Sequence, residues 1–143
     1  RRHEIDVLAE DVLREAGLTP LPKFPESYID MFEVKEVKKL PLGTKCEIKT
    51  NLEGVWLNVD GETIPCSSPE EAKFLYWSVL VGKEEVLLPS DKEKMAQAVN
   101  VFEKEFLERI KTLDEWLQKN IPSQKEKKVI REKVIEKLLK SKI

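Results

Sequence analysis

Apolar residues near the start of the chain recur at the spacing of an α-helix. Between residues 4 and 16 they stand at Ile5, Leu8, Ala9, Val12, Leu13 and Ala16. This period gathers them on one face, so we expect an amphipathic helix over residues 4–16 that packs on the core. Gly17 is typical of the residue that follows a helix. Three prolines, at positions 20, 22 and 25, then predict an extended connector, because proline lacks an amide donor and disfavours helix before it.

The pattern then changes to a period of two. From residue 32 to residue 66 apolar positions alternate with charged ones, which is typical of half-buried strands with one solvated face. The alternation is present in segments 32–38, 45–49 and 55–59. Asp60 and Gly61 then favour a two-residue hairpin before residues 62–66. The sequence therefore predicts an antiparallel meander of three or four strands.

A helix is predicted to begin directly after the meander. Ser68 is a typical N-cap, Pro69 suits the first helical position, and Glu71 stands three residues after the cap. Apolar side chains then cover almost the whole circumference: Ala72, Phe74, Leu75, Tyr76, Trp77, Val79 and Leu80. We therefore expect this helix, which ends at Gly82, to be the most buried one. The apolar residues 86–88 predict a short strand that could join the meander.

Two further helices are predicted at the C-terminal end. Ser90 to Glu93 repeat the capping pattern, and Pro122 marks the end of the first of the two helices. Its apolar seam consists of Met95, Val99, Phe102, Phe106, Ile110, Leu113 and Leu117. Ser123 caps the second helix, whose stripe consists of Ile130, Val134, Ile135, Leu138 and Leu139. A connection this short folds the two helices into an antiparallel hairpin.

Together these elements predict the α+β class: a small antiparallel meander sheet packed on a buried central helix, with a C-terminal antiparallel helical hairpin. A chain of 143 residues fits a single domain over 1–143, with the sheet and central helix in 1–89 and the hairpin in 90–143. The many Glu and Lys residues are a feature of proteins from hot environments. Because the chain begins with Arg1, we expect it to be a trimmed or partial polypeptide.

Positive charge is concentrated in the last helix. Residues 121–143 hold eight Lys or Arg against three Asp or Glu, whereas the whole chain has a net charge of −2. Such a cluster is either a nucleic-acid contact, in which cations neutralise phosphates, or a solvated helix face, which is the commoner case. The candidate nucleic-acid contacts are Lys125, Lys127, Lys128, Arg131, Lys133 and Lys137.

The first helix of the hairpin is expected to expose apolar surface. At 1.5 Å per residue, a helix of about 30 residues is about 45 Å long, which is more than the small sheet covers. Apolar residues near Trp116 and Leu117 would then stay exposed unless a protein partner or a second copy of the chain covers them. The candidate partner seam consists of Phe106, Leu113, Trp116 and Leu117.

Few residues offer metal-binding or catalytic chemistry. Cys46 and Cys66 are far apart in sequence and the single histidine is His3, so we expect no zinc site and no cofactor, and interpret both thiols as buried and free. We find no catalytic motif. No apolar run is long enough for a membrane span and no signal peptide is recognisable, which predicts a cytoplasmic protein.

One triplet resembles the layout of metal-dependent nucleases. Asp30, Glu47 and Lys49 follow the D…E-x-K order, in which two carboxylates hold Mg²⁺ and the lysine orients water. Any amphipathic strand in a Glu- and Lys-rich chain produces E-x-K, so we favour a structural role for these residues.

Three segments, 59–62, 68–76 and 82–89, are similar to stretches near the C-termini of restriction-modification polypeptides that carry adenine-methylase domains. The resemblance covers under a quarter of the chain and includes neither the Asn/Asp-Pro-Pro-Tyr box nor the cofactor loop of that family. It implies a noncatalytic accessory region of a DNA-acting protein, and it assigns no functional residue.

The sequence thus favours a noncatalytic protein-interaction or accessory module that uses the C-terminal helical hairpin. The alternative is a DNA-contacting accessory domain of a larger restriction-modification or other DNA-acting protein, through the basic last helix.

Overall fold

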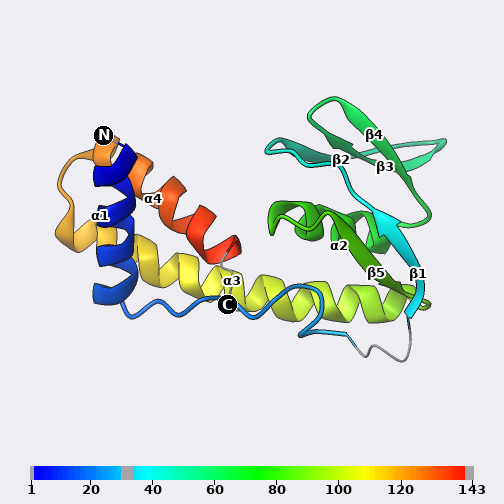
Figure 1. The fold of residues 1–143 in the computed structure, drawn as a ribbon, viewed down its shortest axis with the longest axis horizontal. Coiled ribbons are helices and arrows are strands. Elements are labelled where there is room, and N and C mark those ends of the chain that lie inside the picture. The colour runs from blue at the N-terminus through cyan, green and yellow to red at the C-terminus, as the bar shows by residue number, and fades with distance from the viewer. Residues whose placement is uncertain (1, 30–33, 141–143) are drawn as a thin grey trace. The chain divides into compact units, whose positions relative to one another are not determined.

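The computed structural model describes residues 2–29 and 34–140 (Figure 1). Within these ranges the chain forms four α-helices and five β-strands, with the strands in two separate antiparallel sheets. The α+β class predicted from the sequence is confirmed.

The chain forms two compact units. The helical unit consists of Arg1–Leu21 and Lys104–Ile143, and the sheet unit consists of Pro22–Glu103. Helix α3 (Lys92–Asn120) crosses the boundary and contributes residues to both units. The expectation of one domain over the whole chain stays a prediction.

The sheet unit contains the predicted meander. Strands β2 (Cys46–Asn51), β3 (Gly54–Val59) and β4 (Glu62–Cys66) pair antiparallel in the order β2-β3-β4. The loop between β3 and β4 has two residues, Asp60 and Gly61, both with positive φ, at 48° and 90°. This conformation is that of a type I′ turn, so the predicted hairpin is confirmed.

A second sheet takes two strands that we expected in the meander. Strand β1 (Val34–Lys39) pairs antiparallel with β5 (Glu85–Pro89), and the Leu40 amide donates to the Glu84 carbonyl, which extends this ladder. The expectation that both strands join the meander is therefore wrong, because alternation identifies a strand but not its neighbour. In the alternating segment 32–38, which we expected to be half-buried, Val37 is 55% exposed, and Phe32 lies outside the described residues.

Helix α2 (Pro69–Leu80) is the buried central helix of the sheet unit. Its start is as predicted: the Ser68 hydroxyl accepts a hydrogen bond from the Glu71 amide at 3.1 Å, and Pro69 occupies the first turn. The helix packs against the three strands of the meander. Its side chains that are buried are Glu71, Ala72, Phe74, Leu75, Trp77, Ser78 and Val79.

The first part of α3 closes the core of the sheet unit. The Glu93 amide donates to the Asp91 side chain at 2.9 Å, so Asp91 and not the predicted Ser90 caps the helix. An aspartate at this position offers a stronger acceptor directly before the first turn. The Phe102 ring of α3 packs against Phe24 in a tilted arrangement, with ring centroids 4.8 Å apart, and Trp77 contacts the same Phe102 ring with centroids 5.4 Å apart.

Three helical segments form the helical unit: α1 (Arg2–Glu15), residues 104–120 of α3, and α4 (Gln124–Leu139). Gly17 has a φ of 70° where α1 ends, and Ser123 caps α4 by accepting from the Glu126 amide. The buried apolar residues of this unit are Ala9, Val12, Leu18, Leu21, Ile110, Leu113, Leu117, Ile130, Val134 and Leu138.

Replacing Leu75 with alanine should strongly destabilise the sheet unit. Leu75 is fully buried in α2, so the variant loses burial and leaves a cavity, at a cost of roughly 2 to 5 kcal/mol in the free energy of unfolding. Urea denaturation followed by tryptophan fluorescence measures this change. Leu52→Ala is the control, because the Leu52 side chain is fully exposed in the β2–β3 turn. Equal effects of the two substitutions would contradict the central position of α2.

Candidate functional site

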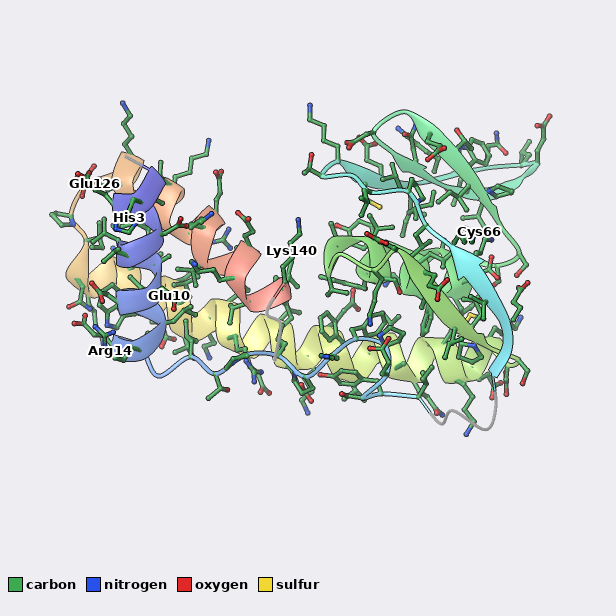
Figure 2. All side chains as sticks on the ribbon, in the orientation of Figure 1. His3, Glu10, Arg14, Cys66, Glu126 and Lys140 are labelled. Carbon is green, nitrogen blue, oxygen red and sulfur yellow. The ribbon has the colours of Figure 1, made fainter. Side chains whose placement is uncertain are left out.

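The basic helix α4 directs two of its lysines toward α1. Lys133 lies 3.0 Å from the Asp6 carboxylate, and Lys137 lies 2.9 Å from that of Glu10. Figure 2 labels Glu10 on α1. The hydrogen bond from Lys133 lowers the pKa of Asp6, and the same contact raises the pKa of Lys133. These two cations therefore help α4 bind its neighbour within the helical unit.

Two more of the candidate nucleic-acid contacts face α3. The Arg131 guanidinium donates to Asp114 at 2.8 Å, and the Lys127 ammonium donates to the Gln118 side chain at 3.2 Å. Lys125 and Lys128 are exposed. Four of the six candidates thus have partners within the helical unit, and contact with nucleic acid stays a prediction.

The expected partner seam is largely covered within the helical unit. Leu113 is fully buried and Leu117 is 2% exposed, so the expectation that Leu117 stays exposed is wrong. Phe106 and Trp116 are partly buried. That expectation assumed that only the sheet could cover α3. The second half of α3 instead belongs to one compact unit with α1 and α4, and α4 donates hydrogen bonds to Asp114 and Gln118 of α3.

The two contacts between α3 and α4 also fix the register of the hairpin. Lys127 of α4 contacts Gln118 of α3, and four residues later Arg131 contacts Asp114, which lies four residues earlier on α3. The two helices therefore run antiparallel at this point. Two more turns in the same directions bring Leu107 level with the end of α4.

Helical spacing from these two contacts places three incompletely buried apolar residues toward this end of the hairpin. Leu107 is 62% exposed, and Ile135 and Leu139 of α4 are partly exposed. We name Leu107, Ile135 and Leu139 the hairpin strip. Sequence periodicity placed Ile135 and Leu139 in the apolar stripe of the last helix. It did not single out Leu107, which lies off the seam, because the register of the hairpin was unknown.

The sheet unit contains a cleft of about 330 Å³ beside the edge strand β2. Its apolar residues are Ile48 from β2, Pro69 from α2, and Ala96 and Val99 from α3. Glu70 and Lys73 from the first turns of α2 and Asn100 from α3 form its polar rim. Clefts for small ligands occupy about 300 to 1,000 Å³, so this one suits one or two side chains. Periodicity along the chain could not reveal it, because its walls come from three distant segments.

The E-x-K triplet lies on the opposite face of the meander. Lys49 forms an ion pair with Glu47 at 2.9 Å, and both line a polar hollow near the β3–β4 turn. Asp30, the third residue of the nuclease pattern, lies outside the described residues. Residues 2–29 and 34–140 contain no group of three or more His, Cys, Asp or Glu side chains arranged to hold a metal ion.

Both cysteines are free thiols and partly buried, on the two outer strands of the meander. Burial raises the pKa of the Cys46 thiol to about 11, with further contributions from Asp60 and Cys66. Burial also raises the pKa of Cys66, which is labelled in Figure 2. Neither thiol therefore has the lowered pKa of a nucleophilic cysteine.

Glu71 is a buried charged residue whose role the sequence showed only in part. The residue is 5% exposed, and its carboxylate accepts from the Ser67 amide at 3.0 Å and the Ser67 hydroxyl at 3.1 Å. Lys38 from β1 lies 3.5 Å away and also donates to the Pro65 carbonyl of β4. This group joins α2 to both sheets, which the capping pattern alone could not reveal.

No protein-family model, curated protein or solved structure matches the chain. In the described part of the chain, every helix is too short or too polar to cross a membrane.

Alkylation of Cys46 should be slow in the folded protein. With a pKa of about 11, its thiolate is scarce at neutral pH, and we expect iodoacetamide to react at least about ten-fold more slowly than with the urea-unfolded chain. A Cys66→Ser background isolates the reaction, and mass spectrometry measures it. Because the pKa of Cys46 is raised in the folded chain, the neutral thiol contributes fully to the free energy of unfolding below its ordinary pKa of 9.0. This contribution is lost as pH rises through about 11. Equal rates in both states would contradict the burial of this thiol.

Reversing one charge of the Lys133–Asp6 pair should destabilise the helical unit, and reversing both charges should restore its stability. Lys133→Asp places two carboxylates opposite each other at Asp6 and lowers the free energy of unfolding, while adding Asp6→Lys recovers it. Lys128→Asp is the control, since Lys128 is exposed on the same helix. Because Lys133 lowers the pKa of Asp6, the native pair stabilises above the ordinary Asp pKa and loses its effect as pH falls. Urea denaturation at neutral and acidic pH measures both effects, and a double variant no more stable than Lys133→Asp would contradict the pairing.

Proposed function

We propose that the chain is a noncatalytic protein-interaction or accessory module whose hairpin strip binds a helix of a protein partner. The observation that carries this proposal is the exposure of Leu107, at 62%, on a regular helix whose other apolar residues in the helical unit are mostly buried.

The geometry of the hairpin strip supports this mode of binding. Two antiparallel helices form a shallow groove along their line of contact, and an amphipathic helix can place its apolar face there. Burying one leucine side chain contributes about 1.5 to 3 kcal/mol, so Leu107 is a suitable anchor. The Asp114–Arg131 pair at one end gives the groove a polar boundary, as is usual around the apolar centre of an interface.

An accessory role in a larger DNA-acting assembly is compatible with this proposal. In that case the partner helix belongs to another part of the assembly, and the hairpin strip holds the module in place. Direct DNA contact through α4 is less well supported, because Lys127, Arg131, Lys133 and Lys137 already contact side chains of α1 and α3.

A photo-crosslinking residue at position 107 tests the proposal. The variant carries p-benzoylphenylalanine in place of Leu107 and is produced in the cells that naturally make this protein. Irradiation should give one discrete covalent adduct with a protein partner. The same replacement at Leu52, which is more exposed than Leu107 but lies on the β2–β3 turn, should give none. Leu139→Lys should abolish the adduct from position 107, because a charge in the strip opposes burial of apolar side chains. Identical crosslinking from both positions, or an adduct insensitive to Leu139→Lys, would contradict the proposal.

A further inference from the structure

The two outer strands of the meander differ in how well their edges are protected. On β4, Pro65 has no amide donor, and the Lys38 ammonium occupies its carbonyl at 3.1 Å. Strand β2 contains no proline, and within the described residues it pairs only with β3. Its outer backbone groups are therefore available to another strand.

The sequence of β2 is complementary to itself. In an antiparallel pair of two β2 strands centred on Ile48, each Ile48 lies opposite the partner's Ile48. Glu47 then lies opposite the partner's Lys49, and Lys49 opposite the partner's Glu47. Opposite charges in directly facing positions favour such a pair, and like charges oppose it. Glu47 and Lys49 are accessible for this exchange, since their side chains are 67% and 49% exposed.

The cleft beside β2 lies on the face where Ile48 points. Ile48 pairs with the buried Leu57, so both side chains face α2. A strand added to β2 continues the sheet over the cleft, and its side chain opposite Ile48 faces Ala96 and Val99. A volume of about 330 Å³ accommodates that side chain, and two-fold symmetry fills the cleft of the other copy in the same way.

We propose that two copies of this chain associate through antiparallel pairing of their β2 strands, with Ile48 of each copy completing the cleft of the other. The two three-stranded meanders join into one continuous sheet. Backbone hydrogen bonds hold the strands together, and the crossed Glu47 and Lys49 pairs fix the register. This contact is separate from the hairpin strip and does not depend on the proposed function.

Charge reversals at β2 test the proposal by light scattering and analytical ultracentrifugation. The natural chain should be a dimer. Glu47→Lys places lysine opposite lysine at both ends of the pair, and Lys49→Glu does the same with glutamates. Each should raise the dimer dissociation constant about ten-fold to a hundred-fold. Mixing the two single variants should restore a one-to-one heterodimer, because every facing pair is then of opposite charge.

Two control variants distinguish β2 pairing from association through a different surface. Glu62→Lys reverses an exposed charge on β4, the protected edge of the same sheet, and should leave the dimer unchanged. Leu107→Lys, in the hairpin strip, should also leave it unchanged. Circular dichroism confirms that each variant is folded. A natural chain that stays monomeric at the highest attainable concentration, a Glu47→Lys variant that dimerises normally, or folded single variants that fail to associate when mixed would each overturn the proposal.

Discussion

A buried carboxylate must be surrounded by donors, and this requirement organises the sheet unit. Glu71 lies in the first turn of α2, where the amide and hydroxyl of Ser67 and the ammonium of Lys38 satisfy it. Removing the Lys38 ammonium would leave the buried carboxylate without an opposite charge, which costs more free energy than the ion pair itself contributes. The three donors come from β1 and from the segment between β4 and α2. One side chain therefore fixes the start of the central helix relative to both sheets.

Local signals in the sequence predicted the elements of the fold well. The Ser68 cap, the Asp60–Gly61 turn and the stop at Pro122 each depend on a few neighbouring residues, and all three occur in the structure. The pairing of β1 with β5 was missed, because strand neighbours are chosen by long-range packing rather than by local pattern. The N-cap of α3 was predicted one residue too early, at Ser90 instead of Asp91. This smaller error is local, because both residue types suit an N-cap.

The surface was harder to predict than the core. A periodic pattern shows which side chains share a helix face, but not which distant segment will cover that face. Leu113 and Lys133 illustrate the two consequences: an apolar residue expected at a partner surface is buried, and a cation considered for phosphate binding pairs with Asp6. Leu107 and the cleft at Ile48 illustrate the opposite error, a surface feature that the pattern did not predict. Each depends on segments that are distant in sequence and come together only in the fold.

The helical unit is assembled from both ends of the described chain, with the whole sheet unit between them. During synthesis α1 therefore leaves the ribosome long before α4, the helix that supplies Lys133 and Lys137 to its acidic side. The sheet unit can fold in the meantime, since domains generally form as units while the chain emerges. For that interval α1 is an unpaired acidic amphipathic helix whose apolar residues have no cover. The order of translation thus makes α1, the first helix of the described chain, wait for α4 before it can reach its final place.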